Sequence, residues 1–325
     1  MATPPPLHLP TLGCGTWAWG NRLLWDYSPD MDQSLQQVFN TCVSNGITFF
    51  DTGDSYGTGR LNGRSESLLG QFSGAYSGSN ADRVCLATKL APYPWRLTRG
   101  AMVSAHEASA KRMGCVDLVQ LHWSTANYFP WQENVLLDGL ADLYEQGKVK
   151  GVGLSNFGPK RLRLACDRLS KRGVPIKTLQ VQYSLLSTYP VSELGLKSVC
   201  DELGIQLIAY SPLCLGILTG KYAEDGPYPK GLRGLVFRRL LPKVRPVLQQ
   251  LDSMAQQRGK TMAQVALNWC ICKGTMPIPG AKNARQVEDN LGALGWTLTA
   301  DEVGLLDEAI AQSEGAAVQN PFQSK

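Results

Sequence analysis

The stretch Ile47-Thr48-Phe49-Phe50-Asp51 is a short apolar run that ends in a carboxylate, and the glycine-rich segment 52–59, TGDSYGTG, follows it directly. Two later runs, 83–89 and 116–122, have the same form and end in Lys and His. Each run is separated from the next by a stretch with the apolar spacing of a helix. Short apolar strands alternating with helices predict a parallel sheet that is covered on both faces.

The alternation of strands and helices continues along most of the chain. We expect strands at 10–17, 47–51, 83–89, 116–122, 149–155, 178–182, 206–210 and 275–279. We expect helices at 32–44, 65–71, 99–113, 131–145, 160–170, 191–203, 247–258, 261–272 and 284–294. Eight such units favour an α/β chain folded as one (β/α)8 TIM barrel domain over 1–325, with its active site at the C-terminal strand ends. A doubly wound sheet is less favoured, because no G-x-G-x-x-G motif follows a strand.

Composition excludes several classes of protein. The 325 residues carry a formal net charge of +5, and 43% of them are hydrophobic, which is typical of a globular chain. No run of 18 apolar residues is present, and the first ten residues do not resemble a signal or transit peptide. Nine scattered cysteines without a C-x-x-C pair agree with a reducing compartment, and three histidines are too few for a His-rich metal site, so no metal is expected.

The segment 211–246, after the seventh expected strand, is too long for an ordinary loop between strand and helix. Within it, residues 221–245 hold seven basic and two acidic side chains, a local charge of +5. Two interpretations remain open, a clamp for an anionic ligand over one barrel mouth and a solvated charged loop. The polar tail after Asp307 either wraps around the barrel or frays.

Titratable residues end three successive strands, and in a barrel these ends converge on one mouth. Asp51 and Lys89 are expected to pair, and Tyr56 in the glycine-rich loop is expected beside Lys89, whose ammonium would stabilise a phenolate. A neutral His122 would then donate a hydrogen bond to a substrate carbonyl. The set can protonate an alkoxide but contains no nucleophile, so it requires a hydride donor from outside the protein. The alternative is a plain ion pair that closes the barrel top.

Asp51, Tyr56, Lys89 and His122, in this order, resemble the complete catalytic tetrad of the aldo-keto reductase superfamily. Five further motifs match that superfamily along residues 10 to 312. They are 151–157 (GVGLSNF), 180–183 (QVQY), 209–213 (AYSPL), 216–221 (GILTGK) and 278–283 (IPGAKN). The resemblance implies a TIM barrel, carbonyl reduction and a nicotinamide cofactor.

The resemblance also implies which residues bind the cofactor. Ser155, Asn156 and Gln182 match those that bind the nicotinamide carboxamide, and Tyr210 matches the aromatic that stacks on its ring. The diphosphate is expected at Ser211, Leu213, Gly216, Leu218 and Lys221, and the adenosine end at Gly280, Lys282, Arg285, Gln286, Asp289 and Asn290. Arg233 is also expected to bind the cofactor. Lys282 and Arg285 at a helix start suit a 2′-phosphate, so NADPH/NADP+ is expected rather than NADH.

Several stretches resemble one subgroup, the plastid pyridoxal reductases of plants and their cyanobacterial relatives. They are 15–21 (GTWAWGN), 56–63 (YGTGRLNG), 93–98 (YPWRLT), 122–126 (HWSTA) and 268–274 (NWCICKG). Cys214 departs from the subgroup, in which Gly is expected. Trp19, Trp95 and Trp123 are expected to form flat walls of the substrate pocket.

The sequence therefore predicts an NADPH-dependent aldo-keto reductase that reduces an aldehyde to a primary alcohol, with pyridoxal to pyridoxine as the leading reaction. One alternative is a broad-specificity reductase that detoxifies reactive aldehydes and ketones. Another is a regulatory module like the potassium channel beta subunits, which have Asn where this chain has His122. The expected partner is a small carbonyl substrate, without nucleic acid or membrane, and the sequence does not decide between monomer and homo-oligomer. A cytoplasmic location, in a cyanobacterium or another bacterium, is expected, or the plastid stroma if a transit peptide was removed.

Overall fold

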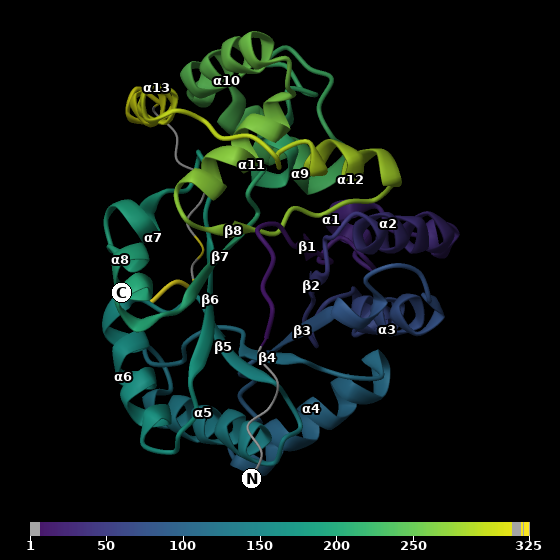
Figure 1. Ribbon diagram of the computed structural model, residues 1–325, viewed down its shortest axis with the longest axis vertical. Helices are drawn as coiled ribbons and strands as arrows, with labels where there is room; N and C mark the ends of the chain where they lie inside the picture. Colours follow the sequence, from purple (N-terminus) through teal and green to yellow (C-terminus); the bar gives the residue numbers. More distant parts are fainter. Residues whose placement is uncertain (1–6, 314–319, 321, 325) are drawn as a thin grey trace.

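The computed structural model describes residues 7–313, 320 and 322–324. Eight parallel strands form one sheet in the order β1 to β8, so each strand pairs with its neighbours in the chain. Their bounds are β1 Cys14–Gly15, β2 Phe49–Asp51, β3 Cys85–Leu90, β4 Leu118–Leu121, β5 Gly151–Ser155, β6 Ile176–Gln182, β7 Gln206–Tyr210 and β8 Met276–Pro277. The sheet curls into a barrel with the helices around it (Figure 1), as predicted.

The seam between β8 and β1 is closed by backbone hydrogen bonds, from Gly13 to the carbonyl of Pro277 at 3.0 Å and from Gly15 to that of Pro279 at 3.2 Å. A Cβ atom on Gly15 would lie 2.9 Å from the Ile278 carbonyl oxygen, so only glycine permits this approach. The strand β1, with two residues, is much shorter than the expected strand 10–17.

Helices cover the outside of the barrel. Their bounds are α1 Arg22–Trp25, α2 Asp32–Ser44, α3 Arg64–Ala75, α4 Arg99–Met113, α5 Pro130–Glu145, α6 Pro159–Ser170, α7 Tyr189–Ser192, α8 Leu196–Leu203, α9 Gly231–Leu240, α10 Arg245–Arg258, α11 Met262–Cys272, α12 Ala284–Leu291 and α13 Ala300–Ala311. Short 3-10 helices lie at Pro29–Met31, Gly59–Leu61, Ala81–Arg83, Cys214–Thr219 and Leu241–Val244. No helix in the described part of the chain is long and apolar enough to cross a membrane.

Local chemistry explains where several helices begin and end. Thr98 caps α4 by accepting a hydrogen bond from the backbone of Ala101, and Thr261 and Thr299 form capping boxes with Gln264 and Glu302. The expected helix 191–203 is instead two helices, α7 and α8. Gly195, with φ +63°, lies between them in the left-handed conformation that interrupts a helix.

Two apolar cores hold the barrel together. The smaller core lies inside it and includes Phe49, Leu118, Ile208 and Met276, which project inward from β2, β4, β7 and β8. The larger core fills the space between the sheet and the helices, as expected where one face of each strand packs on helices. The strands therefore hold their last residues in fixed positions at one rim.

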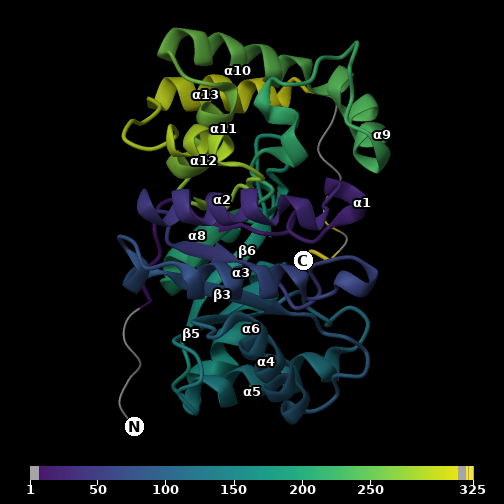
Figure 2. The same cartoon turned by 90° about the vertical axis from the view of Figure 1, so that its right-hand side faces the viewer.

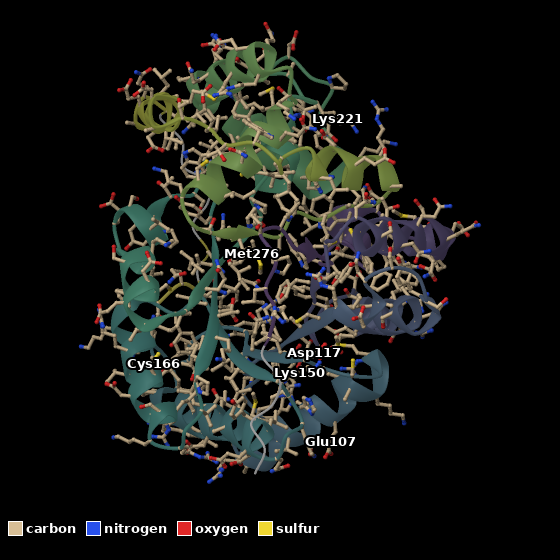
Figure 3. The ribbon with its side chains drawn as sticks, in the orientation of Figure 1. Glu107, Asp117, Lys150, Cys166, Lys221 and Met276 are labelled. Atoms are coloured by element: carbon tan, nitrogen blue, oxygen red, sulfur yellow. The ribbon has the colours of Figure 1, made fainter. Side chains whose placement is uncertain are left out.

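The segment 211–246 is more regular than the sequence predicts. It contains the helix α9, which contacts α1 near the start of the chain. The two helices lie side by side in Figures 1 and 2. In Figure 3, Lys221 of this segment lies in the upper half of the view, away from the ion pair of Asp117 and Lys150 (2.7 Å) in the lower half. That ion pair precedes β4 and β5, so it belongs to the opposite rim of the barrel.

Candidate active site

A cavity of about 750 Å³ lies at the carboxyl ends of the strands. One part of it, the strand end, is formed where β2, β3, β4 and β6 finish. The other part, the loop end, is formed by residues 211–221, α9 and the start of α12. This volume is typical of a site for a small molecule or cofactor.

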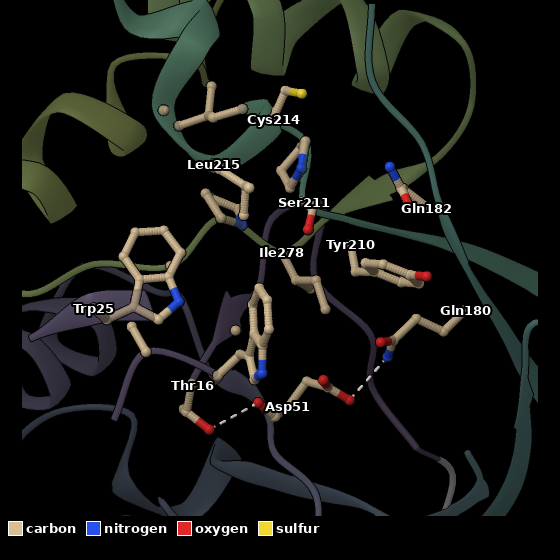
Figure 4. A pocket seen from close by; sticks show the side chains of 18 of the residues that line it. Thr16, Trp25, Asp51, Gln180, Gln182, Tyr210, Ser211, Cys214, Leu215 and Ile278 are labelled. Atoms are coloured by element: carbon tan, nitrogen blue, oxygen red, sulfur yellow. Dashed lines mark hydrogen bonds between the residues drawn. The ribbon is translucent and has the colours of Figure 1, made fainter. Parts of the chain in front are cut away.

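At the strand end, the Asp51 carboxylate forms a buried network. Asp51 and Lys89 are 2% and 1% exposed and form an ion pair. The other carboxylate oxygen accepts hydrogen bonds from the side-chain amides of Gln120 at 2.9 Å and Gln180 at 2.8 Å (Figure 4 shows Asp51 with Gln180). Each buried charge thus has a partner, which offsets the cost of burying it.

Tyr56 lies over this ion pair, with Lys89 Nζ 4.9 Å from the centre of its ring. Burial raises the pKa of Tyr56 well above its usual value, and the nearby carboxylates of Asp51 and Asp54 raise it further. In the protein alone the pKa of Tyr56 is therefore raised and not lowered, although the Lys89 ammonium lies beside its ring. The hydroxyl of Tyr56 is therefore protonated at neutral pH, as a proton donor must be.

His122 follows β4 directly and faces Tyr56, with 5.7 Å between the ring centres. Burial lowers the pKa of His122 well below its usual value, and the charge of Lys89 lowers it further. Its Nδ1 has no hydrogen-bond partner within the described residues. The imidazole is therefore neutral at pH 7 and able to donate one hydrogen bond to a bound group.

Asn156 connects this cluster to the next strands. Its side-chain nitrogen donates to the His122 carbonyl at 3.1 Å, and its side-chain oxygen accepts from the Tyr210 hydroxyl at 3.0 Å. Asn156 has φ +60°, a left-handed backbone that Asn tolerates better than most residues. The side-chain amide of Asn156 is thus held in one orientation beside His122.

At the loop end the backbone is strained. Ser211, Cys214 and Leu215 have φ of +52°, +46° and +57°, although none is glycine. A residue with a Cβ atom in this region costs on the order of 1 kcal/mol or more. This conformation explains why Gly was expected at position 214, where this chain has Cys, because glycine adopts it without strain.

Most of the predicted site residues line the cavity. All four tetrad residues do so, and so does Trp123. The predicted cofactor residues that line it are Ser155, Asn156, Gln182, Tyr210, Ser211, Leu213, Gly216, Lys221, Arg233, Gly280, Lys282, Gln286, Asp289 and Asn290.

Two predicted cofactor residues do not line the cavity. Leu218 is fully buried in the larger core, so its side chain supports the loop from behind. Arg285 lies in the first turn of α12, on its exposed side. In an isolated sequence a residue in a loop motif cannot be assigned to its inner or outer face.

Two of the three tryptophans that were predicted to form the substrate pocket do not line the cavity. Trp19 is fully buried, where its indole donates to the Ala281 carbonyl at 3.1 Å. Trp95 is 71% exposed and stacks on Tyr93, with 4.6 Å between the rings, away from the cavity. The apolar character of an aromatic does not distinguish core, surface and pocket.

Other aromatic residues line the cavity as a whole. Trp17, Trp25 and Phe322 line the cavity, and Phe322 stacks on Trp123 at 4.6 Å between ring centres. Asn320 also lines the cavity and donates to the side-chain oxygen of Asn156 at 2.9 Å. Trp17 follows β1, so its position after a strand could have indicated it. The sequence left open whether the tail after Asp307 wraps around the barrel, and Asn320 and Phe322 show that it returns to the cavity.

In the described residues, no cluster of three or more His, Cys, Asp or Glu side chains is arranged to hold a metal ion.

Comparison with known proteins agrees with this geometry. The model of the aldo/keto reductase family matches residues 11–311. The chain is 55% identical over 324 residues to a chloroplastic pyridoxal reductase of Arabidopsis thaliana, covering 98% of this chain and 88% of the relative. It is 30% identical to an L-glyceraldehyde 3-phosphate reductase of Escherichia coli strain K12, covering 95% and 91% of the two chains.

Solved structures show the same architecture. An aldo/keto reductase of Klebsiella pneumoniae in complex with NADP and acetate is 25% identical, with a TM-score of 0.72 over 96% of this chain and 95% of that one. The glycerol dehydrogenase AKR11B4 of Gluconobacter oxydans is 24% identical, with a TM-score of 0.78 over 99% and 98% of the two chains. At that identity the second likeness concerns the fold alone.

Proposed function

Because the chain belongs to the aldo/keto reductase family, we propose that it is an NADPH-dependent reductase that converts pyridoxal to pyridoxine. The observation that carries this proposal is the pairing of two uncharged donors, Tyr56 and His122, over the buried ion pair of Lys89 and Asp51. Two such donors suit a carbonyl oxygen, on which negative charge develops during reduction.

The reaction divides between the cofactor and the chain. The cofactor supplies a hydride to the carbonyl carbon. Neutral His122 donates a hydrogen bond that orients the carbonyl oxygen, and Tyr56 transfers its hydroxyl proton to that oxygen as the carbonyl π bond breaks. The products are the primary alcohol and a phenolate on Tyr56, which the ammonium of Lys89 stabilises until solvent returns a proton.

The cavity fits a nicotinamide dinucleotide. Ser155, Asn156, Gln182 and Tyr210 lie together beside His122, where a flat ring with a carboxamide needs an aromatic face and amide partners. At the loop end, Lys221, Arg233 and Lys282 form no ion pair with any carboxylate of the described residues. Three cations at one end favour a cofactor with phosphate groups. NADPH carries a 2′-phosphate in addition to its diphosphate, so it suits these cations better than NADH.

The substrate is inferred from the pocket walls and from the relative. Trp123 lies beside His122 and stacks on Phe322, so the two present aromatic faces that suit a flat pyridine aldehyde, and Trp17 also lines the cavity. The relative from Arabidopsis thaliana, at 55% identity, is a pyridoxal reductase, and vitamin B6 metabolism is accordingly the proposed context.

We further propose that one barrel domain carries this activity, in the cytoplasm or in the plastid stroma. The broad-specificity alternative uses the same tetrad with a less selective pocket. The binding-module alternative is less favoured, because His122 is present and is positioned as a hydrogen-bond donor.

The test is NADPH consumption by the purified protein with pyridoxal, pyridoxal 5′-phosphate, methylglyoxal and a nitrobenzaldehyde, with Tyr56→Phe as control. A clear preference for pyridoxal in kcat/KM, lost in the variant, supports the proposal. Equal kcat/KM for all four aldehydes contradicts pyridoxal as the specific substrate. Absence of turnover despite tight NADPH binding contradicts the enzyme assignment and favours the binding module.

A further inference from the structure

Trp25 lies at the loop end of the cavity, with two cations against its ring. The guanidinium carbon of Arg233 is 4.4 Å from the ring centre, and Lys282 Nζ is 5.9 Å from it. Trp25 ends α1, Arg233 belongs to α9 and Lys282 precedes α12, so three elements that are distant in sequence meet at one indole. Figure 4 shows the Trp25 side chain pointing into the cavity, near Leu215.

The two cations lack the partners that buried charges require. Arg233 is only 9% exposed, and its Nη2 donates to the Leu215 carbonyl at 2.9 Å, but its Nε has no partner among the described residues. The pKa of Lys282 is lowered by burial and by the positive charges of Arg233 and Lys221, against the opposite effect of Asp26. An anion between these side chains would relieve both the desolvation and the mutual repulsion.

The Trp25 ring stabilises the two cations, which form no ion pair with a carboxylate in the described part of the chain. A cation against an indole face gains about 0.5–1 kcal/mol when exposed and about 2 when desolvated. The same ring attracts both Arg233 and Lys282, so it keeps two like charges close together while no anion separates them. The indole itself bears no group that takes part in a reduction, since it is neither acid nor base at neutral pH.

We propose that Trp25 is a positioning residue for the phosphate groups of the cofactor, acting through Arg233 and Lys282. Its ring holds the guanidinium and the ammonium in the orientation in which both face an anion. This inference rests on the proposed use of NADPH and adds a residue that contacts none of the reacting atoms. The shared ligand chemistry is a phosphate, supplied either by the diphosphate bridge or by the 2′-phosphate.

The experiment compares Trp25→Leu, which removes the aromatic face, with Trp25→Phe, which keeps a smaller one. Trp95→Leu is the matched control, because Trp95 is exposed and lies outside the cavity. Binding of NADPH, NADH and adenosine 2′,5′-bisphosphate is measured by calorimetry, and kcat is measured at saturating NADPH. All three variants are first checked for wild-type unfolding midpoints.

For Trp25→Leu we expect about a tenfold weaker Kd for NADPH, the equivalent of about 1.4 kcal/mol, with kcat unchanged. Trp25→Phe retains most of the affinity, and Trp95→Leu retains all of it. A loss shared by NADH assigns the contact to the diphosphate, and a loss confined to NADPH and adenosine 2′,5′-bisphosphate assigns it to the 2′-phosphate. Both results support the proposal.

Wild-type affinity in Trp25→Leu overturns the proposal. An equal loss in Trp25→Leu and Trp25→Phe also overturns it, because it would assign the effect to a property that both variants lose, such as the buried indole N–H, and not to the aromatic face. A fall in kcat with unchanged Kd also overturns it. The affinity measurements are independent of the substrate. If the wild-type chain binds NADPH but does not reduce pyridoxal, the proposed function fails while the role of Trp25 is still decided by the affinities.

Discussion

The strand end and the loop end of the cavity differ in how their buried charges are balanced. At the strand end, Asp51 balances Lys89 and accepts two further hydrogen bonds, so the protein alone satisfies its buried charges. At the loop end, Arg233 and Lys282 both lie against one indole and form no ion pair with a carboxylate of the described residues, beside a backbone with three left-handed non-glycine residues. The difference indicates that the strand end is organised before binding, whereas the loop end is completed by its ligand.

The largest effect is expected from removing the proposed proton donor at the strand end. Tyr56→Phe deletes one hydroxyl and should lower kcat by about 10²–10⁴-fold, the usual contribution of a positioned general acid. Because the loop end is untouched, the Kd for NADPH should stay at the wild-type value. Steady-state kinetics and calorimetry on the same preparation measure both quantities, and a fall in NADPH affinity comparable to the fall in kcat would contradict the separation of the two ends.

The next effect concerns stability. Asp51→Asn leaves the buried ammonium of Lys89 without its counter-ion and should lower the free energy of unfolding by about 3 kcal/mol. Glu202→Gln is the matched control, because Glu202 pairs with Arg163 on the surface, where solvent screens the charges, and its loss should lower the free energy of unfolding much less. Urea unfolding measures both variants. Similar losses would show that the strand end does not depend on its buried ion pair.

How much of the site was predictable differs between the two ends. The tetrad residues could be found because each follows an apolar strand or the glycine-rich loop after it, and strand ends converge on one rim. Trp25, Asn320 and Phe322 could not be found in this way, because the path of a loop or tail depends on long-range packing rather than on a local pattern. The same reason explains why Trp19 and Trp95 were assigned to the pocket although one is core and the other is surface.

The fold shows the same division. The limits of α2 and α4 agree with the sequence prediction, because apolar periodicity and the cap at Thr98 are local signals. The helix α9 was missed within the basic segment 211–246, because Leu232 and Leu235 are exposed whereas Arg233 is buried, so its apolar residues do not mark its packed face. Local signals therefore predict the frame of the barrel better than the elements added above it.

A smaller effect is expected from the strained backbone of the loop end. At Cys214, φ +46° penalises any Cβ atom, so Cys214→Gly should be more stable than Cys214→Ala by about 1 kcal/mol. At Cys200, inside α8, the order should reverse, since Gly in a helix is about 1 kcal/mol less stable than Ala. Thermal and urea unfolding of the four variants give the two differences. The same sign at both positions would contradict the strain assigned to the loop end.

The smallest effect is expected from pH, because the pKa values of His122 and Tyr56 should leave kcat/KM nearly constant near neutrality. An ordinary histidine becomes charged near pH ~6.5, but the lowered pKa of His122 moves this acid limb to lower pH. The raised pKa of Tyr56 moves the alkaline limb above its ordinary pH of about 10. We expect kcat/KM to be constant between about pH 6 and 9 for nitrobenzaldehyde, which does not titrate there. A decline below about pH 7 that disappears in a His122 variant would contradict a neutral imidazole.

The most direct test of the account is transfer of deuterium from NADPH labelled at the reactive carbon of its nicotinamide. The account predicts pyridoxine that carries one deuterium at the former aldehyde carbon, detected by mass spectrometry, and the same product formed about 10²–10⁴-fold more slowly with Tyr56→Phe. Unlabelled pyridoxine, or labelled product formed equally well by Tyr56→Phe, would contradict direct hydride transfer with Tyr56 as the proton donor.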